Sequence, residues 1–318
     1  MRIGNIALKN QVILAPMAGI TDSPFRRLAV EMGCALVYTE MISAKGTLYN
    51  PSQTLKIACF KETERPVGIQ LFGSDPVIMA EGAALAAKLE PDLIDINMGC
   101  PVRKVISRGE GCALMLDPEK AYVITRSVCE AVDLPVTVKM RKGWSNDRIN
   151  VVEVARAMQE AGAAAVTIHG RTGEQGYSGT ADWSIIAAVK EKVDIPVIGS
   201  GDIRQPEDAA LMLSETGCDA VMLGRGVLGN LWLIKRTVHF LDTGEILPEP
   251  DKNERLDFAL KHLALVIKEK GEDIGVREMR KQISWYLKGM PNAAKIRNKV
   301  MHAVSRAEVD AILKDAIF

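Results

Sequence analysis

Residues 195–226, IPVIGSGDIRQPEDAALMLSETGCDAVMLGRG, contain two short apolar runs with a helical stretch between them. The two runs, 197–200 and 220–223, are almost continuously apolar rather than alternating, which is typical of strands covered on both faces. Pro206 opens the intervening stretch, as proline often does in the first turn of a helix. The stretch therefore predicts a strand–helix–strand unit of a parallel sheet.

The same pattern recurs along most of the chain. Apolar runs bounded by glycine, proline or polar residues give about eight expected strands: 12–15, 35–39, 67–72, 93–97, 136–140, 165–169, 197–200 and 220–223. Helical stretches such as 77–89, 119–131 and 207–214 lie between them. About eight such units in roughly 240 residues predict an α/β protein with a closed (β/α)8 TIM barrel, and a doubly wound open sheet is the alternative.

The pattern changes near residue 242. Asp-Thr-Gly-Glu at 242–245, followed by Pro248 and Pro250, is typical of a linker, and the sequence beyond about residue 253 has helical periodicity without a strand pattern. We therefore expect a catalytic barrel over residues 1–243 and a small all-helical domain over residues 244–318.

Positive charge is concentrated in the expected helical domain. Lys and Arg together number 40, as do Asp and Glu, so net charge does not by itself indicate a polyanion-binding protein. One acidic residue, Glu278, lies within 277–306 among these basic residues: Arg277, Arg280, Lys281, Lys288, Lys295, Arg297, Lys299 and Arg306. Trp285 and Tyr286 lie within the run, and aromatic rings can stack on bases or sugars. A nucleic-acid surface is therefore at least as well supported as a solvated helix face.

Cysteine use and hydropathy narrow the class of protein. The six cysteines form no CxxC pair, so we expect reduced thiols and neither a disulfide framework nor a metal site. The first residues lack the apolar core of a secretion signal, and no run is long enough and apolar enough to cross a bilayer. A cytoplasmic enzyme without membrane attachment is the expectation.

The predicted strand ends are polar or rich in glycine, and the active sites of such barrels form where these ends meet. Glycines follow the seventh and eighth strands, in Ser200-Gly201-Asp202 and in Gly224-Arg225. Glycine lets backbone N–H groups approach a phosphate closely, and Arg225 adds positive charge. These turns therefore predict a phosphate site, although tight turns alone would also use glycine.

Three further polar residues lie on or at the ends of otherwise apolar strands. Lys139 fits either a Schiff-base nucleophile or a cation beside an electron-rich ring. His169 lies near the predicted phosphate turns, and Gln70 offers both donors and an acceptor to the edge of a heterocycle. Together they predict a phosphorylated aromatic cofactor.

Cys100 differs from the other cysteines in its location. It follows the fourth strand in Asn97-Met98-Gly99-Cys100-Pro101, whereas the others are read as small buried hydrophobic residues. A thiol with an ordinary pKa is mostly protonated at neutral pH, so Cys100 is a candidate general acid.

These motifs, in this order, resemble the tRNA-dihydrouridine synthase family, and the whole chain is similar to its bacterial B-type members. The resemblance rests on the segments Leu14-Ala15-Pro16-Met17-Ala18-Gly19-Ile20-Thr21-Asp22, Gln70-Leu71-Phe72-Gly73, Asp95-Ile96-Asn97-Met98-Gly99-Cys100-Pro101, Thr167-Ile168-His169-Gly170-Arg171-Thr172 and Met290-Pro291-Asn292-Ala293-Ala294-Lys295.

The resemblance implies reduction of the C5–C6 double bond of a D-loop uridine in tRNA, with tightly bound FMN as cofactor and NADPH as reductant. It implies hydride transfer from the reduced flavin to C6 and a proton from Cys100 to C5. The implied FMN contacts are Pro16, Met17, Ala18, Gln70, Lys139, His169, Ser200, Gly201, Asp202, Gly224 and Arg225. Asn97 and Arg141 are the expected base contacts. The uracil must leave its stack to enter the barrel, and contacts to the RNA phosphates can offset that cost. We therefore expect these basic residues of the helical domain to bind RNA: Arg277, Arg280, Lys281, Lys295, Arg297 and Lys299.

Three other functions fit parts of the sequence. An FMN barrel oxidoreductase acting on a free pyrimidine would use the same cofactor residues. An aldolase-like barrel would use Lys139 as a Schiff-base nucleophile and contain no flavin. An RNA-binding protein that has lost catalysis would keep only the basic C-terminal helices.

Overall fold

The computed structural model describes residues 1–315 and contains a parallel barrel. Its strands are β3 (Val12–Leu14), β4 (Val37–Tyr38), β6 (Val67–Phe72), β7 (Leu93–Met98), β8 (Val136–Arg141), β9 (Ala165–His169), β10 (Val197–Ser200) and β11 (Ala220–Leu223). They pair in the order β3-β11-β10-β9-β8-β7-β6-β4. A parallel bridge between Ile13 and Leu36, with the Leu14 N–H donating to the Leu36 carbonyl at 3.0 Å, joins the two ends. The predicted TIM barrel is confirmed, and the open-sheet alternative is wrong.

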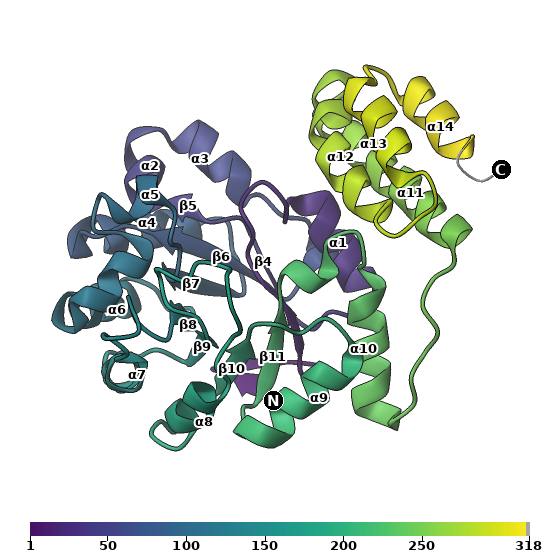
Figure 1. Ribbon diagram of the computed structural model, residues 1–318. Coiled ribbons are helices and arrows are strands. Elements are labelled where there is room, and N and C mark those ends of the chain that lie inside the picture. Colours follow the sequence, from purple (N-terminus) through teal and green to yellow (C-terminus); the bar gives the residue numbers. More distant parts are fainter. Residues whose placement is uncertain (316–318) are drawn as a thin grey trace.

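Helices cover the outside of the barrel (Figure 1). They are α1 (Ser23–Glu31), α4 (Pro76–Ala87), α6 (Pro118–Ala131), α7 (Val151–Glu160), α8 (Ser184–Lys190), α9 (Pro206–Thr216) and α10 (Trp232–Thr243). The aspartates before α1, α4 and α6 accept hydrogen bonds from backbone N–H groups of the first helical turn, and prolines follow them. Such caps satisfy N–H groups that the helix itself leaves unpaired, which explains why these start signals were readable from the sequence.

Several short elements lie outside the regular pattern. They are the hairpin strands β1 (Arg2–Ile3) and β2 (Ile6–Ala7), the strand β5 (Ile42–Ser43), the helices α2 (Ala44–Tyr49), α3 (Pro51–Ala58) and α5 (Arg103–Ile106), and the 3-10 turns η1 (Glu62–Glu64), η2 (Gly111–Leu116) and η3 (Arg225–Val227). Six of these elements, β5, α2, α3, η1, α5 and η2, fall in the segments that connect β4 to β6 and β7 to α6.

The barrel interior changes character along its axis. Ile3, Leu36, Leu93 and Ile198 belong to one buried apolar cluster. Next to Leu93 on the same face of β7, the inward positions become polar at Asp95 and Asn97, because side chains two residues apart share a face of a strand. The polar positions lie toward the carboxyl ends of the strands, where barrels of this type form their sites.

Four helices follow the barrel: α11 (Lys252–Lys270), α12 (Glu272–Tyr286), α13 (Ala293–His302) and α14 (Arg306–Lys314). Figure 1 shows them as a group next to α1, reached through the extended segment after α10. Lys270 bonds to Asp22 at 2.6 Å, and Gln282 Nε2 donates to the Ile20 carbonyl at 3.3 Å. The helical region is therefore attached to the loop between β3 and α1. No helix within residues 1–315 is long and apolar enough to span a membrane.

His262 makes stability depend on pH. It is fully buried on α11, with its Nδ1 3.2 Å from the Tyr286 hydroxyl, and burial lowers its pKa to about 4. Because the unfolded chain holds this imidazole at its ordinary pKa of about 6.5, the stabilisation is complete above pH 6.5 and is lost as pH falls toward 4. We expect this residue to cost about 3 kcal/mol of unfolding free energy over that interval.

Urea unfolding between pH 7 and pH 4 measures this loss. The His262→Gln variant is expected to show a shallower fall in unfolding free energy with pH, whatever its stability at pH 7. Equal slopes for the two proteins would show that His262 does not control the acid limb.

Candidate active site at the barrel mouth

The barrel opens at the carboxyl ends of its strands into a cavity of about 960 Å³. Ligand pockets in proteins typically measure about 300–1,000 Å³, so this one has room for a large cofactor. Its walls include all the barrel residues that the sequence nominated: Pro16, Met17, Ala18, Gln70, Asn97, Cys100, Lys139, Arg141, His169, Ser200, Gly201, Asp202, Gly224 and Arg225. The structure brings together side chains from β3 through β11.

Strand register sets the order of these residues around the cavity. Asn97 lies beside Lys139 on the neighbouring strand. Arg141 is paired in register with His169, and His169 with Ser200. Residues in register on parallel strands face the same side of the sheet. Asn97 and Lys139 therefore form one polar layer, and Arg141, His169 and Ser200 form the next layer toward the carboxyl ends of the strands.

A chain of hydrogen bonds leads from the buried Asp95 up to Asn97 and the cysteine loop. Asp95 accepts from Gln70 Nε2 and from Thr137 Oγ1, both at 2.6 Å. Gln70 Oε1 in turn accepts from Asn97 Nδ2 at 2.8 Å, and Asn97 Oδ1 accepts from the Cys100 N–H at 2.9 Å. The chain of bonds therefore fixes the orientation of the Gln70 amide and ties it to the cysteine loop.

Asp95 and Thr137 are the side chains of this network that sequence reasoning did not single out, and Asp95 is the charged one. It is 1% exposed, and burial raises its pKa to about 6, against the lowering effect of its hydrogen bonds and of Lys139. An acidic residue between Ile94 and Ile96 in a buried strand was the available signal, since a charge on the inward face of a barrel strand needs partners.

Removing this carboxylate is expected to destabilise the barrel. Asp95→Ala leaves the buried donors of Gln70 and Thr137 without their acceptor, and an unsatisfied buried group costs about 1–3 kcal/mol. Urea unfolding measures the loss, and Thr137→Val, which removes a single donor, is the milder comparison. An unfolding free energy for Asp95→Ala equal to that of the native chain would contradict the assigned network.

Cys100 lies on the loop between β7 and α5 and is half-buried. Its carbonyl accepts from the Cys112 N–H at 3.0 Å, and its N–H is held by Asn97. Burial raises the pKa of the thiol, with smaller opposing effects from the Val102 N–H and from the cations Arg141 and Lys139. The loop thus holds a protonated thiol against the cavity at neutral pH.

Lys139 and His169 have shifted pKa values for a shared reason. Burial lowers the pKa of Lys139 to about 8, helped by the charge of Arg141. Burial also lowers the pKa of His169 well below its ordinary value, and the nearby cations Lys139, Arg141, Arg171 and Arg225 act in the same direction. The histidine is therefore neutral, and the cavity floor carries a concentrated positive charge suited to an anionic group.

Arg141 connects two loops of the cavity. Its Nε donates to the Gly99 carbonyl at 2.7 Å, and its Nη1 donates to the carbonyls of Thr172 and Gly176 at 2.8 and 2.7 Å. These bonds join the cysteine loop to the loop after β9. Tyr177, at the exposed tip of that loop, lies 4.6 Å from the Arg225 guanidinium, measured to the ring centroid.

The predicted phosphate turn after β10 is held by an ion pair between the buried Arg171 and the half-buried Asp202. Arg171 Nη2 bonds to both carboxylate oxygens of Asp202 at 2.7 and 2.8 Å, and its Nε donates to the Ser178 carbonyl. Asp202 has a left-handed φ of 58°, and Gly201 before it has a φ of 123°. Arg171 therefore orients the turn through Asp202, whose carboxylate also lies 3.7 Å from Arg225 Nη2.

The basic residues of the helical region are not part of the cavity, with the exception of Lys288 and the unpredicted Arg255. Arg277, Lys281, Lys295, Arg297 and Lys299 are exposed on α12 and α13. Arg280 is half-buried and donates twice to the Ala303 carbonyl, at 3.0 and 2.6 Å. Tyr286 is fully buried, so its interpretation as a stacking surface was wrong, whereas Trp285 lines the cavity.

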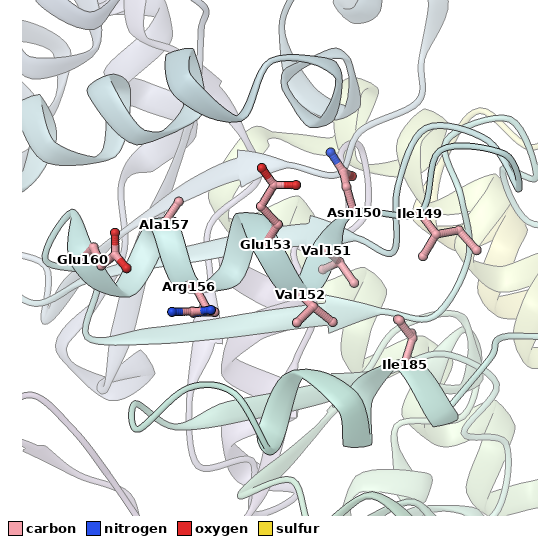
Figure 2. Close-up of a pocket in the computed structure, with 9 residues that line it drawn as sticks. All are labelled: Ile149, Asn150, Val151, Val152, Glu153, Arg156, Ala157, Glu160 and Ile185. Atoms are coloured by element: carbon pink, nitrogen blue, oxygen red, sulfur yellow. The ribbon is translucent and has the colours of Figure 1, made fainter.

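A second pocket of about 530 Å³ lies outside the barrel between α7 and α8 (Figure 2). Its lining includes the apolar residues Val152 and Ile185 and the charged residues Glu153, Arg156 and Glu160. The residues assigned above to catalysis and anion binding belong to the larger cavity.

Solved structures share the barrel architecture. A complex of 2-naphthoyl-CoA reductase with 2-naphthoyl-CoA aligns with a TM-score of 0.59 at 13% identity, covering 77% of this chain and 52% of that one. Morphinone reductase in complex with tetrahydroNAD aligns with a TM-score of 0.55 at 13% identity, covering 80% and 92%. At these identities the similarity shows the fold.

Sequence comparison shows the family. A probable tRNA-dihydrouridine synthase of Rickettsia conorii is 42% identical over 301 residues, covering 94% of this chain and 91% of the relative. The tRNA-dihydrouridine synthase B of Pseudomonas aeruginosa is 41% identical over 297 residues, covering 93% and 90%. The family model described as dihydrouridine synthase matches residues 13–318. The chain therefore belongs to the dihydrouridine synthase family.

Proposed function

We propose that the protein is a flavin-dependent tRNA-dihydrouridine synthase that reduces the C5–C6 double bond of a D-loop uridine. The observation that carries this is the convergence of a half-buried thiol, Cys100, with two glycine-containing turns and the cation of Lys139 in one cavity. The family membership and the tRNA-dihydrouridine synthase relatives support it.

The residues of the cavity fit FMN. The turn of Gly201 and Asp202 and the turn of Gly224 and Arg225 supply N–H groups and positive charge for a phosphate. The Lys139 ammonium makes no ion pair or hydrogen bond within residues 1–315, which suits a cation placed beside an electron-rich ring. We assign Gln70, Lys139 and His169 to the ring, and Pro16, Met17 and Ala18 to its remaining contacts. When bound, FMN supplies the hydride for C6 of the uracil, and NADPH is the proposed source of that hydride.

Cys100 supplies the proton for C5 in this proposal. The loop keeps the thiol protonated until the base arrives, and the Asn97 side chain fixes the loop through the Cys100 N–H. Asn97 and the Arg141 guanidinium are the proposed contacts to the base. The bonds from Arg141 Nε and Nη1 leave Nη2 for the base, whereas Asn97 Nδ2 would exchange its 3.6 Å contact with Met41 Sδ for one to the base.

Residues 244–318 are proposed to bind the tRNA through its phosphates. The exposed basic residues of α12 and α13 support this role, and phosphate contacts offset the cost of about a few kcal/mol for removing a base from its stack. Arg280 contributes from its half-buried position, mainly by bracing Ala303. A cytoplasmic location is part of this proposal, in keeping with a tRNA substrate.

Purified protein incubated with NADPH and unmodified tRNA tests the proposal. We expect a yellow protein that forms dihydrouridine in folded tRNA and not in free uridine, and mapping by position identifies the base. A preference for free uridine would support a free-pyrimidine reductase. A colourless protein that borohydride traps with a carbonyl substrate would support Schiff-base chemistry at Lys139. Binding of RNA without formation of dihydrouridine would support an RNA-binding protein that has lost catalysis.

The pH dependence of this reaction is expected to reflect Lys139. Because its pKa is about 8, the lysine loses its charge as pH rises through 8, and kcat/KM for tRNA should fall over that range. In Lys139→Arg the cation persists, so the alkaline fall moves to higher pH even where the absolute rate is lower. An unchanged alkaline midpoint in this variant would assign the fall to another group.

A further inference from the structure

The helical region carries a stripe of basic and aromatic residues that points at the catalytic cavity. Arg277, Lys281 and Trp285 follow one another at intervals of four residues on α12, so they share a face of the helix. Lys288 comes three residues later, just after the helix ends. Arg277, Lys281 and Lys288 are exposed, and Trp285 is half-buried.

The stripe ends inside the cavity. Trp285 and Lys288 line the same 960 Å³ space as Cys100 and Arg225. Gly229, with a φ of 66°, allows this contact, because a Cβ at that position would lie 2.3 Å from the Trp285 carbonyl carbon. The end of α12 is thus packed directly on the loop that follows the Gly224–Arg225 turn.

Neighbouring contacts fix the backbone that carries the indole. Arg255 Nη2 donates to the carbonyls of Tyr286 and Lys288, at 2.6 and 2.8 Å, which holds the chain beyond the helix. Tyr286 packs into the core of the helical region, with its ring centroid 6.0 Å from that of Phe258. Of two consecutive aromatic residues, one is therefore anchored in the core and the other faces the cavity.

The charge of the stripe is not neutralised within residues 1–315. Arg277, Lys281 and Lys288 take part in no ion pair in that part of the chain, and Lys281 Nζ lies 5.2 Å from the centroid of the Trp285 ring. Glu278, the nearest acidic residue in sequence, is bonded to Lys270 at 2.6 Å. A cationic track that ends at an aromatic ring is the arrangement by which proteins hold single-stranded nucleic acid.

We infer that Trp285 is the platform on which a nucleotide adjacent to the reacting uridine stacks, while Arg277, Lys281 and Lys288 bind the flanking phosphates. The inference rests on the proposed function, since it assumes that a uridine enters the cavity. An extruded base leaves its neighbours partly unstacked, and a ring at the rim of the cavity replaces the lost stacking.

Binding of tRNA to FMN-loaded protein without NADPH tests the platform. We expect Trp285→Ala to raise the Kd on the order of 10-fold and Trp285→Phe to recover most of the affinity, because any aromatic face can stack on a base. The modified uridine is first mapped with the native protein, and tRNAs with an abasic site at either neighbour are then compared. At the neighbour that stacks on Trp285, the effects on Kd of the abasic site and of Trp285→Ala should not be additive.

The charges are tested through the salt dependence of the same Kd. Lys281→Ala should lower the slope of log Kd against log salt by about 1, since one phosphate contact is lost. Lys192→Ala is the matched control, because this exposed lysine precedes β10 at the opposite end of the barrel.

The outcomes separate this inference from the proposed function. A native protein that forms no dihydrouridine overturns both. Two results would overturn the platform alone if the native protein is active. One is an unchanged Kd for Trp285→Ala, and the other is additivity of the effects on Kd of Trp285→Ala and of an abasic site at both neighbouring nucleotides. A folded Trp285→Phe variant that binds as weakly as Trp285→Ala also refutes stacking.

Discussion

Replacement of Cys100 by alanine is expected to reduce dihydrouridine formation by about 100- to 10,000-fold, the usual contribution of a general acid. The thiol is held protonated at the cavity wall, and the bonds that fix its loop come from the backbone, so they survive the substitution. We therefore expect the variant to fold, to bind flavin and to bind tRNA with nearly native affinity. The loss should appear in kcat, because the proton is transferred only in the reaction itself.

Single-turnover reduction of tRNA by the pre-reduced protein measures this step directly. Cys129→Ala is the matched control, since Cys129 is a half-buried cysteine on α6, outside the lining of the cavity. Native single-turnover rates in Cys100→Ala would remove the thiol from the mechanism. Loss of flavin in this variant would instead assign Cys100 a binding role.

Replacement of Arg171 by methionine is expected to give the largest loss of stability, about 3–5 kcal/mol of unfolding free energy. The guanidinium is fully buried and bonds to both oxygens of Asp202, to the Ser178 carbonyl and to the Gly179 carbonyl. Methionine fills much of the volume but donates no hydrogen bond, so the Ser178 and Gly179 carbonyls lose this donor and Asp202 keeps the Ala181 N–H and the more distant Arg204 and Arg225. Since Asp202 shapes the turn after β10, we expect the flavin content of the purified variant to fall as well.

Urea unfolding and the ratio of flavin to protein absorbance measure the two effects. Arg171→Lys retains the charge but lacks the planar fork that binds two oxygens, so an intermediate loss is expected. The double variant Arg171→Met with Asp202→Asn removes the carboxylate that has lost its shortest ion pair and should regain part of the stability. A native unfolding free energy and native flavin content in Arg171→Met would refute the positioning role of this pair.

The barrel and the place of its site follow from local patterns. Continuous apolar runs, capped helix starts and glycines after residues 200 and 223 depend on neighbours a few positions away in the chain, so they were readable one segment at a time. Dependence on local patterns also explains why some short elements were not predicted. The short elements α2, α3 and β5 lie between predicted segments, where no single period dominates.

The helical region shows where the sequence pattern was insufficient. Trp285 and Tyr286 are adjacent and equally aromatic, and the run of charges around them gives no sign of which ring is buried. Packing of α12 against α11 and against the β11–α10 loop decides it: Tyr286 contacts Phe258, and Trp285 faces the cavity.

The sequence by itself determined the barrel, the residues at its strand ends and, through its motifs, the family. Only the tertiary structure decided which of these residues touch. Gln70, Asp95 and Thr137 become neighbours through the register of three strands, and Arg171 meets Asp202 across 31 residues of chain. The physical reason is that periodicity fixes the face on which a side chain lies, whereas its partners depend on strand register and on the docking of elements distant in sequence.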